Sequence, residues 1–494
     1  MTQERTGRPQ RSTPAGAEPA GHTAGVDYED VGDDYLNRRQ LRRGTAGPVL
    51  LVALGVGYVI AGDYAGWNYG IGEAGWGGMM VAVALMALMY TTMCSSMAEM
   101  ATIIPTAGGG YGFARRALGP WGGFLTGTAV LLEFVLAPAA VATFISAYVE
   151  SLIGFSGPLV YVVCYAAFLG LHLYGVSQVL KLVMGFAVVA VTGIVIFSVV
   201  MIPHFDPGKL LDIAPTDAVG ASAFLPFGVV GIWAALPYAI WLFLAVEGVP
   251  LASEEAREPA RDVPRGMNGG VLVLTVLALL LMLLAPGGAG AGAVGEWDNP
   301  LISAMEATGG TTWVSQLVNV LGLVGLISSF FTITYAYSRQ TFALSRAGYL
   351  PRVLSLTNGR KSPFLALLIP GAIGFGLSFT GAGDLLILIA VFGATVSYVL
   401  MMISHIVLRI REPNLHRPYR APGGVFTSGV ALVLAAAAMI ACFVVDPTVG
   451  LYAAGAYAVM IAYFAFYSRH HLVARAPEEE FAALAQAEHE LDAR

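Results

Sequence analysis

A dozen long apolar stretches, separated by short loops, constrain this chain more than any other feature of its sequence. A helix needs about 20 mostly apolar residues to cross a bilayer, and clusters of glycine, proline and charged residues mark the loops between such helices. We therefore predict an all-α membrane protein with twelve transmembrane helices. The predicted spans are 47–72, 76–102, 121–150, 158–177, 180–203, 224–250, 268–287, 313–338, 363–380, 384–408, 425–445 and 449–468.

The charge content excludes the soluble classes of protein. Only 12% of the 494 residues are charged, whereas soluble globular domains carry about 25%. The net charge of −6 leaves no basic stripe for a nucleic acid, so the lipid bilayer is the one large partner that we expect. Residues 1–43 are polar and rich in proline, and they predict a disordered tail. Residues 471–494 predict a second tail, which includes a short acidic helix at 477–494.

The basic residues predict how the chain is oriented in the membrane. Of the 26 lysines and arginines, 25 fall on one side of the predicted spans, and only Lys209 falls on the other. Because cytoplasmic loops are enriched in lysine and arginine, both termini should be cytoplasmic, in a multi-pass protein of the cell (inner) membrane. The opposite side is acidic, either because insertion leaves acids behind or because a negative vestibule concentrates cations. Its acids are Glu73, Glu150, Asp206, Asp212, Asp217, Glu296, Asp298, Glu306 and Asp446.

Two predicted spans carry helix-breaking residues at their middles. Span 1 contains Asp63 between glycines, and a carboxylate at that depth must face the protein interior or a water cavity. The glycines either form a close packing face or permit local unwinding. In span 6, Pro237 and the sequence around Glu247 interrupt the helix. If spans 1–5 and 6–10 are two repeats, these interruptions occupy equivalent places, which is typical of secondary transporters with inverted repeats and discontinuous helices.

Further polar residues lie at the middle of spans 3 and 8. Glu133 lies at the centre of span 3, where it either bonds a neighbouring helix or faces a substrate. The hydroxyls of span 8, among them Ser328 and Ser329, either bond their own backbone or line a pathway. No phosphate-binding loop, metal-ligand spacing or nucleophile elbow is found in the sequence. We therefore expect no enzyme activity, no cofactor and no metal site.

Four stretches of the sequence resemble the amino acid–polyamine–organocation (APC) transporter superfamily, and within it the bacterial ethanolamine permeases. They are VIAGDYAGWNYG (59–70), AEMATIIPTAGGGYGFARRALGPWGGFLTG (98–127), AALPYAIWLFLAVEGVPLASEEAREPARDVPRG (234–266), and SRAGYLPRVL (345–354) with KSPFLALL (361–368). The resemblance implies a five-plus-five inverted repeat of the leucine-transporter type, with helices 1–10 in residues 44–408 and helices 11–12 in 409–470. It also implies a substrate site between spans 1, 3, 6 and 8.

The resemblance also implies which residues form this site. The unwound part of span 1 runs from Asp63 to Asn68, and its backbone amides hold the substrate carboxylate in amino acid carriers. Trp241 takes the place of an aromatic gate, and Glu133 stands where relatives have small side chains. Trp67 leaves little room for a carboxylate, which favours an amine without one. The predicted substrate-binding residues are Asp63, Tyr64, Ala65, Gly66, Trp67, Asn68, Glu133, Trp241, Leu244 and Glu247.

We therefore expect a secondary active transporter that imports ethanolamine or a similar small cationic amine by alternating access. An amino acid permease of the same superfamily is the alternative, and a channel or a non-transporting sensor is a remoter one. For the coupling ion we favour a proton carried by Glu247 or Asp63, because a buried carboxylate can carry one. Sodium remains an alternative, held by span 1 carbonyls with Ser328 or Ser329. The sequence does not predict the oligomeric state.

Overall fold

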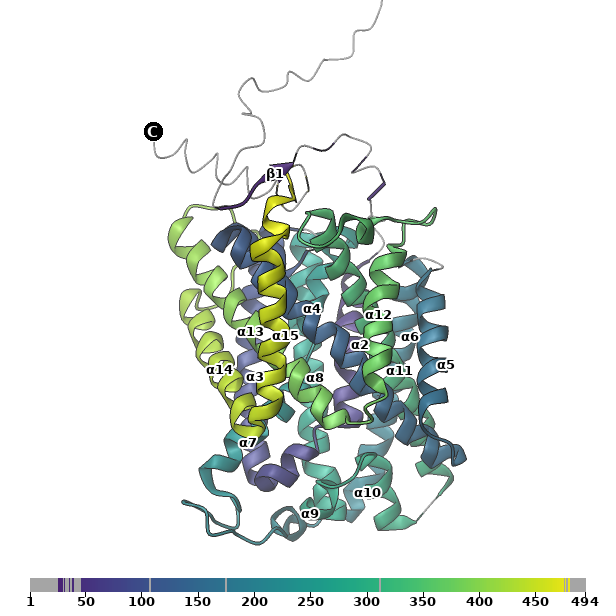
Figure 1. Cartoon of the computed structure of the whole chain (residues 1–494). Coiled ribbons are helices and arrows are strands. Elements are labelled where there is room, and N and C mark those ends of the chain that lie inside the picture. Colours follow the sequence, from purple (N-terminus) through teal and green to yellow (C-terminus); the bar gives the residue numbers. More distant parts are fainter. Residues whose placement is uncertain are drawn as a thin grey trace, which may run out of the picture.

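The protein folds into a bundle of long helices (Figure 1). The computed structural model describes residues 25–29, 31, 35, 38–39, 46–105, 108–173, 176–310, 312–474, 476 and 479. The long and shorter apolar helices are α2 (Pro48–Tyr64), α3 (Tyr69–Ile103), α4 (Gly110–Ile153), α5 (Pro158–Leu173), α6 (Val176–Met201), α7 (Gly228–Trp241), α8 (Pro259–Ala289), α11 (Trp313–Arg346), α12 (Phe364–Ser378), α13 (Gly383–Arg411), α14 (Val425–Val445) and α15 (Pro447–Phe466).

Each of the twelve predicted spans overlaps one of these helices. Within the described residues, nine helical segments are long and apolar enough to cross a membrane, with α7 counted together with the 3-10 helix that follows it. The other three, α2, α5 and α12, are shorter apolar helices. An all-α membrane protein is thereby confirmed. Two short helices that the sequence did not predict, α9 (Ala291–Val294) and α10 (Pro300–Gly309), lie in the connection between α8 and α11.

The helices predicted to be discontinuous are both interrupted in the structure. Helix α2 ends at Tyr64, and α3 begins only at Tyr69, so residues 65–68 are non-helical. Helix α7 ends at Trp241, and a 3-10 helix, η3 (Val246–Glu255), begins after Ala245, whose φ is 77°. Because a positive φ costs an alanine conformational energy, the packing around Ala245 must hold this break in place.

The two breaks lie side by side near the middle of the bundle. Helix α2 packs against α11, η3 and α8, and α4 packs against α11 and α13. Helices α14 and α15 pack on α13 at one side of the bundle, away from α5 and α6 (Figure 1). The core around the breaks is therefore built from α2, α4, η3 and α11.

The two ends of the chain meet on one face of the bundle, which we call the termini face (Figure 1). Strand β1 (Tyr28–Glu29) pairs in parallel with β2 (Leu472–Val473), and the Val473 amide donates to the Ala347 carbonyl at 3.0 Å. Most of the predicted tail 1–43 and of the predicted tail 471–494 lies outside the described residues. Short 3-10 helices on this face are η4 (Arg352–Ser355) and η5 (Ser468–His470).

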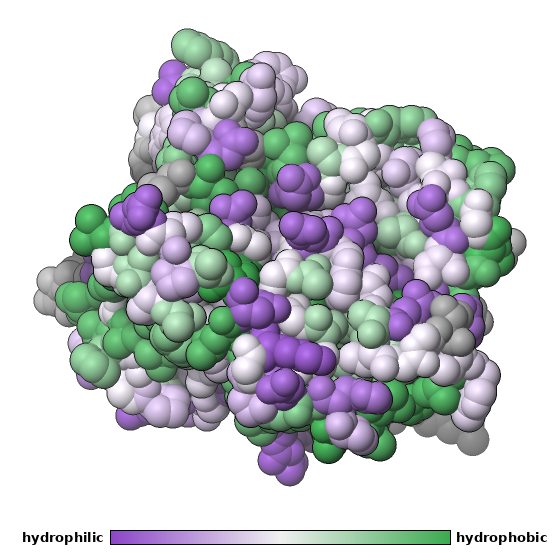
Figure 2. Space-filling view, turned by 90° about the horizontal axis from the view of Figure 1, so that it is seen from below, coloured by the Kyte–Doolittle hydropathy of each residue, from purple (hydrophilic) through white to green (hydrophobic). Residues whose placement is uncertain are grey.

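The other end of the bundle, the opposite face, carries α9, α10 and the loop between α6 and α7. Figure 2 views this face and shows hydrophilic residues scattered across it, with hydrophobic residues along much of its rim. A pocket on it is lined by Glu150, Tyr69 and Asp298, and the Tyr69 hydroxyl donates to the Asp298 carboxylate at 2.8 Å. Two of the acids predicted for this side thus border one hollow. The 3-10 helices of this region are η1 (Ile202–His204) and η2 (Pro207–Leu211).

Candidate functional site

A small cavity lies where α2, α4, α7 and α11 meet, and we call it the central cavity. Its volume is about 10 Å³. One water needs roughly that much, so the cavity has room for about one water molecule in this conformation. Its lining residues are Tyr58, Val59, Ala61, Gly62, Val141, Trp241, Leu244 and Ile333.

Close contact between the two helix breaks forms one wall of the cavity. A Cβ on Gly62 would lie 2.4 Å from the Trp241 carbonyl oxygen, so only glycine permits this approach. The indole N–H of Trp241 donates to the Ala65 carbonyl oxygen at 2.9 Å. Because Ala65 lies in the break after α2, this bond satisfies a backbone group that the broken helix leaves free. Trp241 thus lines the cavity and joins the two breaks.

The other predicted residues of the first break hold its shape. The Tyr64 hydroxyl donates to the Ala190 carbonyl at 2.6 Å, and the Trp67 indole donates to the Asp63 carbonyl at 3.2 Å. The Asn68 amide donates to two carbonyls of the α9 region, Val294 at 2.9 Å and Trp297 at 2.7 Å. Its own oxygen accepts from the Gly66 N–H at 3.2 Å, so that amide already has a partner.

Two buried carboxyl groups lie next to each other, one on α4 and one on η3. Glu133 of α4 and Glu247 of η3 are 0% and 3% exposed, and they interact electrostatically with each other. Within the described part of the chain, the groups that these carboxyls reach are each other, the Tyr398 hydroxyl and backbone groups at the break, and no cation is among them. The hydroxyl of Tyr398 lies close to both and is 2.9 Å from the hydroxyl of Tyr90. A buried charge without a partner is costly, so this carboxyl pair requires a proton or a cation.

The carboxyl pair lies toward the termini face from the cavity. Val141, which lines the cavity, follows Glu133 by eight residues on α4, which corresponds to about 12 Å along a helix. Tyr58 connects the two places, because its ring would contact a Cβ on Gly248 at 3.0 Å, next to Glu247, and its hydroxyl is buried without a partner.

The structure does not bring Asp63 into this group. Its side chain is fully buried, and both carboxylate oxygens lack a hydrogen-bond partner among the described residues. Among the described residues, no charged side chain lies near enough to interact with it, whereas Glu133 and Glu247 interact with each other. Of the predicted binding residues, Trp241 and Leu244 line the cavity, Glu133 and Glu247 form the carboxyl pair, and Asp63 lies apart.

The predicted hydroxyls of α11 face α2. The Ser329 hydroxyl donates to the Gly57 carbonyl at 2.9 Å and accepts from the Ala61 amide at 2.8 Å. Ser328 is buried beside Gly57, and its oxygen lacks a partner within the described residues. Ser329 thus bonds another helix, which neither of the two alternatives for these hydroxyls had predicted, and Ser328 remains open to a ligand.

Two ion pairs that the sequence did not predict lie between the cavity and the termini face. Glu255 of η3 pairs with Arg339 of α11 at 3.0 Å and accepts from the Tyr335 hydroxyl at 2.9 Å, and all three are almost fully buried. Glu254 pairs with Arg346 at 2.7 Å. The pairs join the segment after the second break to α11. The only signal in the sequence was the adjacent acids of the segment SEEAREPARD, which has no pattern that identifies their partners.

Most of the cavity lining was also missed. Tyr58, Ala61 and Gly62 are spaced so that they share one face of α2, but this face is apolar, and apolar faces normally pack into the core. Val141 and Ile333 are ordinary helix residues by sequence. Among the described residues, no group of three His, Cys, Asp or Glu side chains could hold a metal ion.

The chain is similar to several known proteins. The model of a family described as "Amino acid permease" matches residues 47–467. An uncharacterized transporter of Rhizobium meliloti is 27% identical over 80% of this chain and 86% of its own length. The branched-chain amino acid permease BcaP of Bacillus subtilis is 26% identical over 78% and 84%. The methylthioribose transporter of Bacillus subtilis is 28% identical over 75% and 82%.

Proposed function

Because the chain belongs to the amino acid permease family, we propose that it is a secondary active transporter that imports a small cationic amine, with ethanolamine as the favoured substrate. Its family and relatives make it a multi-pass membrane transporter rather than an enzyme. We propose its substrate, the binding site of that substrate and the coupling ion.

The carboxyl pair of Glu133 and Glu247 is the observation that carries the proposal. Two carboxylates that are buried next to each other repel each other, and a substrate with its own carboxylate adds a further negative charge. An ammonium group without a carboxylate supplies the missing positive charge instead. We place the ammonium between the central cavity and this pair, with the indole face of Trp241 on its other side as a cation–π contact.

The geometry of the first break also supports an amine. In amino acid carriers the break offers free backbone amides to a carboxylate, but here the Gly66 amide is occupied by the Asn68 side chain. The central cavity has a volume of about 10 Å³ in this conformation, so a substrate of few atoms requires the least expansion.

Alternating access follows from the two breaks and the ion pairs. In the proposed cycle the conformation described here is closed toward the termini face by Glu255–Arg339 and Glu254–Arg346. Opening on that side requires these pairs to separate, which moves η3 away from α11. We propose twelve crossings, a five-plus-five inverted repeat and a cytoplasmic termini face in the inner membrane, because the basic residues gather there.

A proton is the proposed coupling ion, carried by the carboxyl pair with Glu247 as the group that changes its protonation. The neighbouring acid makes a second negative charge at this place unfavourable, so a proton and an ammonium compete for it. Sodium is the alternative, because the Ser328 hydroxyl, which has no hydrogen-bond partner among the described residues, lies beside Gly57 of α2. Asp63 is the remaining candidate for carrying a proton.

An amino acid permease is the second candidate function, favoured by relatives. One of them is named a branched-chain amino acid permease, and another, a cationic amino acid transporter 7 of Arabidopsis thaliana, is 24% identical over 55% of this chain and 48% of its own length. In this case the substrate carboxylate would lie at the first break and its ammonium toward the carboxyl pair.

Uptake into proteoliposomes tests the proposal. Labelled ethanolamine, choline, serine and leucine are compared, with the pH gradient and the sodium gradient imposed separately. We expect ethanolamine to accumulate under a pH gradient without sodium. Accumulation of leucine or serine in its place would establish the amino acid permease, and unitary currents far above carrier turnover would establish a channel.

A further inference from the structure

A second, larger pocket lies at the termini face between α8 and the loop that precedes α14. Its volume is about 490 Å³, compared with about 10 Å³ for the central cavity. Two arginines, an asparagine and a tyrosine line it, together with small residues. The lining residues are Ala260, Arg261, Pro264, Arg265, Asn268, Gly269, Pro418 and Tyr419.

The polar groups of this pocket are free to bind an anion. Arg265 has no ion-pair partner within the described part of the chain. Arg261 has only Glu258 at 3.9 Å, and both of these side chains are more than 60% exposed, so their attraction is weak. The Asn268 amide donates to the Tyr419 hydroxyl at 3.2 Å, so that hydroxyl keeps its own proton to donate. Guanidinium groups match the oxygens of a phosphate better than any other side chain.

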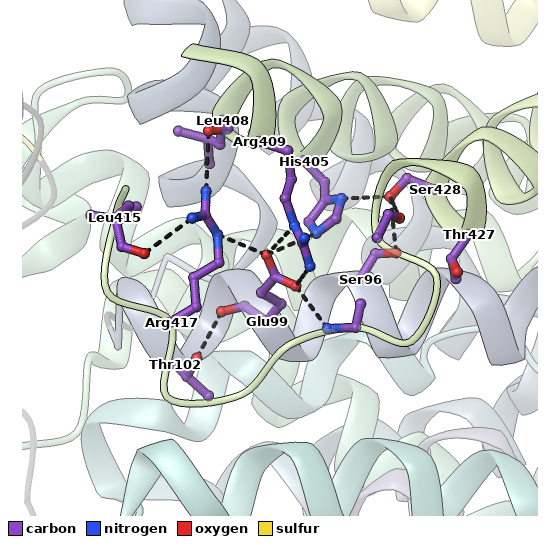
Figure 3. A network of polar contacts seen from close by, with 12 residues as sticks. Ser96, Glu99, Thr102, His405, Leu408, Arg409, Leu415, Arg417, Thr427 and Ser428 are labelled. Atoms are coloured by element: carbon purple, nitrogen blue, oxygen red, sulfur yellow. Dashed lines mark hydrogen bonds and ion pairs between the residues drawn. The ribbon is translucent and has the colours of Figure 1, made fainter. Parts of the chain in front are cut away.

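The second wall of the pocket is held rigidly in place. Pro418 and Tyr419 lie between two contacts with Glu99 of α3: Arg417 pairs with it at 2.9 Å, and the Ala421 amide donates to it at 2.7 Å. Figure 3 shows Arg409, Arg417 and His405 converging on this one carboxylate. The Ser95 hydroxyl, also on α3, donates to Asn268 at 3.1 Å. The pocket therefore persists as a preformed hollow rather than a gap between mobile side chains.

An exposed apolar stripe continues directly from the pocket along α8. Arg261, Arg265 and Asn268 are followed at helical spacing by further residues on the same face of the helix. These are Leu272, Val276, Leu279 and Leu283, which are 66%, 51%, 41% and 39% exposed. Phe426 and Val433, exposed at 78% and 67%, present similar surfaces on α14, and both α8 and α14 pack on α3. The positive charge at the start of α8 matches the phosphate headgroup of a phospholipid, and the apolar stripe that follows it matches the acyl chains.

We propose that this pocket binds the phosphate headgroup of an anionic phospholipid, whose acyl chains lie along the exposed stripe of α8. Basic pockets at the ends of membrane helices recognise such headgroups. The apolar stripe favours a lipid over a free phosphate ion, which has nothing to place there. The bound lipid would join α8, which packs on α2 and η3, to the α13–α14 loop.

Native mass spectrometry of the full chain tests this proposal. The protein is reconstituted in phosphatidylcholine with phosphatidylglycerol, extracted, and examined for retained phosphatidylglycerol. The variant Arg261→Gln/Arg265→Gln should lower its occupancy about tenfold or more, since two charge-assisted phosphate contacts are lost. Arg261→Lys/Arg265→Lys should retain most of it. The matched control is Lys361→Gln/Arg411→Gln, which removes two exposed charges that do not line the pocket.

Two outcomes would overturn the proposal. Equal retention of phosphatidylglycerol by the double glutamine variant and by the control would show that the arginines do not hold the lipid. Displacement of the lipid by millimolar inorganic phosphate, or equal binding of phosphate in detergent, would make the pocket a free-anion site. Because the readout is bound lipid, neither outcome depends on which substrate is transported.

Discussion

The indole N–H of Trp241 donates to the carbonyl oxygen of Ala65 at 2.9 Å, and this bond joins the breaks of the two interrupted helices. Trp241 is the last residue of α7, and Ala65 is the first non-helical residue after α2. A movement of either break therefore changes the position of the ring that covers the central cavity. In the proposed function, substrate binding and the positions of the two half-helices are coupled through this contact.

Replacing the ring tests the proposed cation–π contact. Trp241→Leu should weaken ethanolamine binding by about 1–2 kcal/mol, because the ammonium loses its aromatic face. Trp241→Phe keeps an aromatic face but loses the bond to Ala65, so it should retain more affinity than leucine does. Equilibrium binding to purified protein measures both, and Trp313→Leu, at an exposed position, is the control. Equal affinities in wild type and Trp241→Leu would remove this ring from the site.

Removing the charge of Glu133 should abolish binding of a cationic substrate. Glu133→Gln keeps the shape and leaves the ammonium without one of its two carboxylates, at a cost on the order of 3 kcal/mol for an unpaired buried charge. The fold should remain intact, because glutamine has nearly the same shape and can still hydrogen-bond to the neighbouring Glu247. Isothermal titration with ethanolamine measures the loss. Glu150→Gln, on the same helix at the opposite face, should bind normally.

Replacing Glu247 should separate transport from its driving force. Glu247→Gln should still exchange external for internal ethanolamine, because exchange moves no net proton, but it should not accumulate substrate under a pH gradient. The two assays are run on the same proteoliposomes. If accumulation still follows the imposed pH gradient, the proton is carried elsewhere, and Asp63→Asn becomes the next variant.

The buried pair of Glu255 and Arg339 should show strong energetic coupling. Either single substitution, Glu255→Gln or Arg339→Gln, leaves one buried charge without its partner and should destabilise the protein by about 3–5 kcal/mol. The double variant should be less destabilised than the sum of the two, and thermal unfolding measures the difference as a double-mutant cycle. Additive effects would show that the pair does not hold η3 to α11.

The contact between the termini should weaken in acid. A hydrogen bond from His471 and the nearby Arg352 hold the pKa of Glu29 below its ordinary value. A carboxylate with a lowered pKa stabilises the folded contact above its ordinary pKa, and this contribution is lost as the pH falls through the lowered pKa. The protection of the β2 amides against hydrogen exchange, measured relative to their intrinsic exchange rates at each pH, should therefore fall in this acid range. Glu29→Gln should remove that pH dependence while the control Glu258→Gln retains it.

Helix positions and the breaks were predictable, because the apolar lengths and the interrupting residues are local features of the sequence. The region of the candidate site was predictable for the same reason, since Gly62 and the sequence around Glu247 mark interruptions, whereas Trp241 was indicated by the resemblance to the APC superfamily. The grouping of the acids was not predictable. Asp63 and Glu247 have similar sequence surroundings, yet only Glu247 lies beside Glu133, and this depends on how α2 and η3 turn about their own axes in the bundle.

The lining and the ion pairs depend on contacts between distant segments. Tyr58 and Ile333 are apolar-face residues whose role comes from the meeting of α2 with α11. Glu255 and Arg339 are 84 residues apart, and the sequence alone does not indicate that they pair. The parallel pairing of β1 with β2 joins the two ends of the chain, where composition alone predicted unstructured tails.

We propose that Glu133 and Glu247 together select an amine without a carboxylate. It is tested most directly by the equilibrium affinities of purified wild-type protein for ethanolamine and for serine, its carboxylated analogue, with the same pair measured on Glu133→Gln. We expect the wild type to bind ethanolamine more tightly than serine, and we expect the variant to lose that preference. Tighter binding of serine by the wild type, or normal ethanolamine binding by Glu133→Gln, would contradict it and establish the amino acid permease.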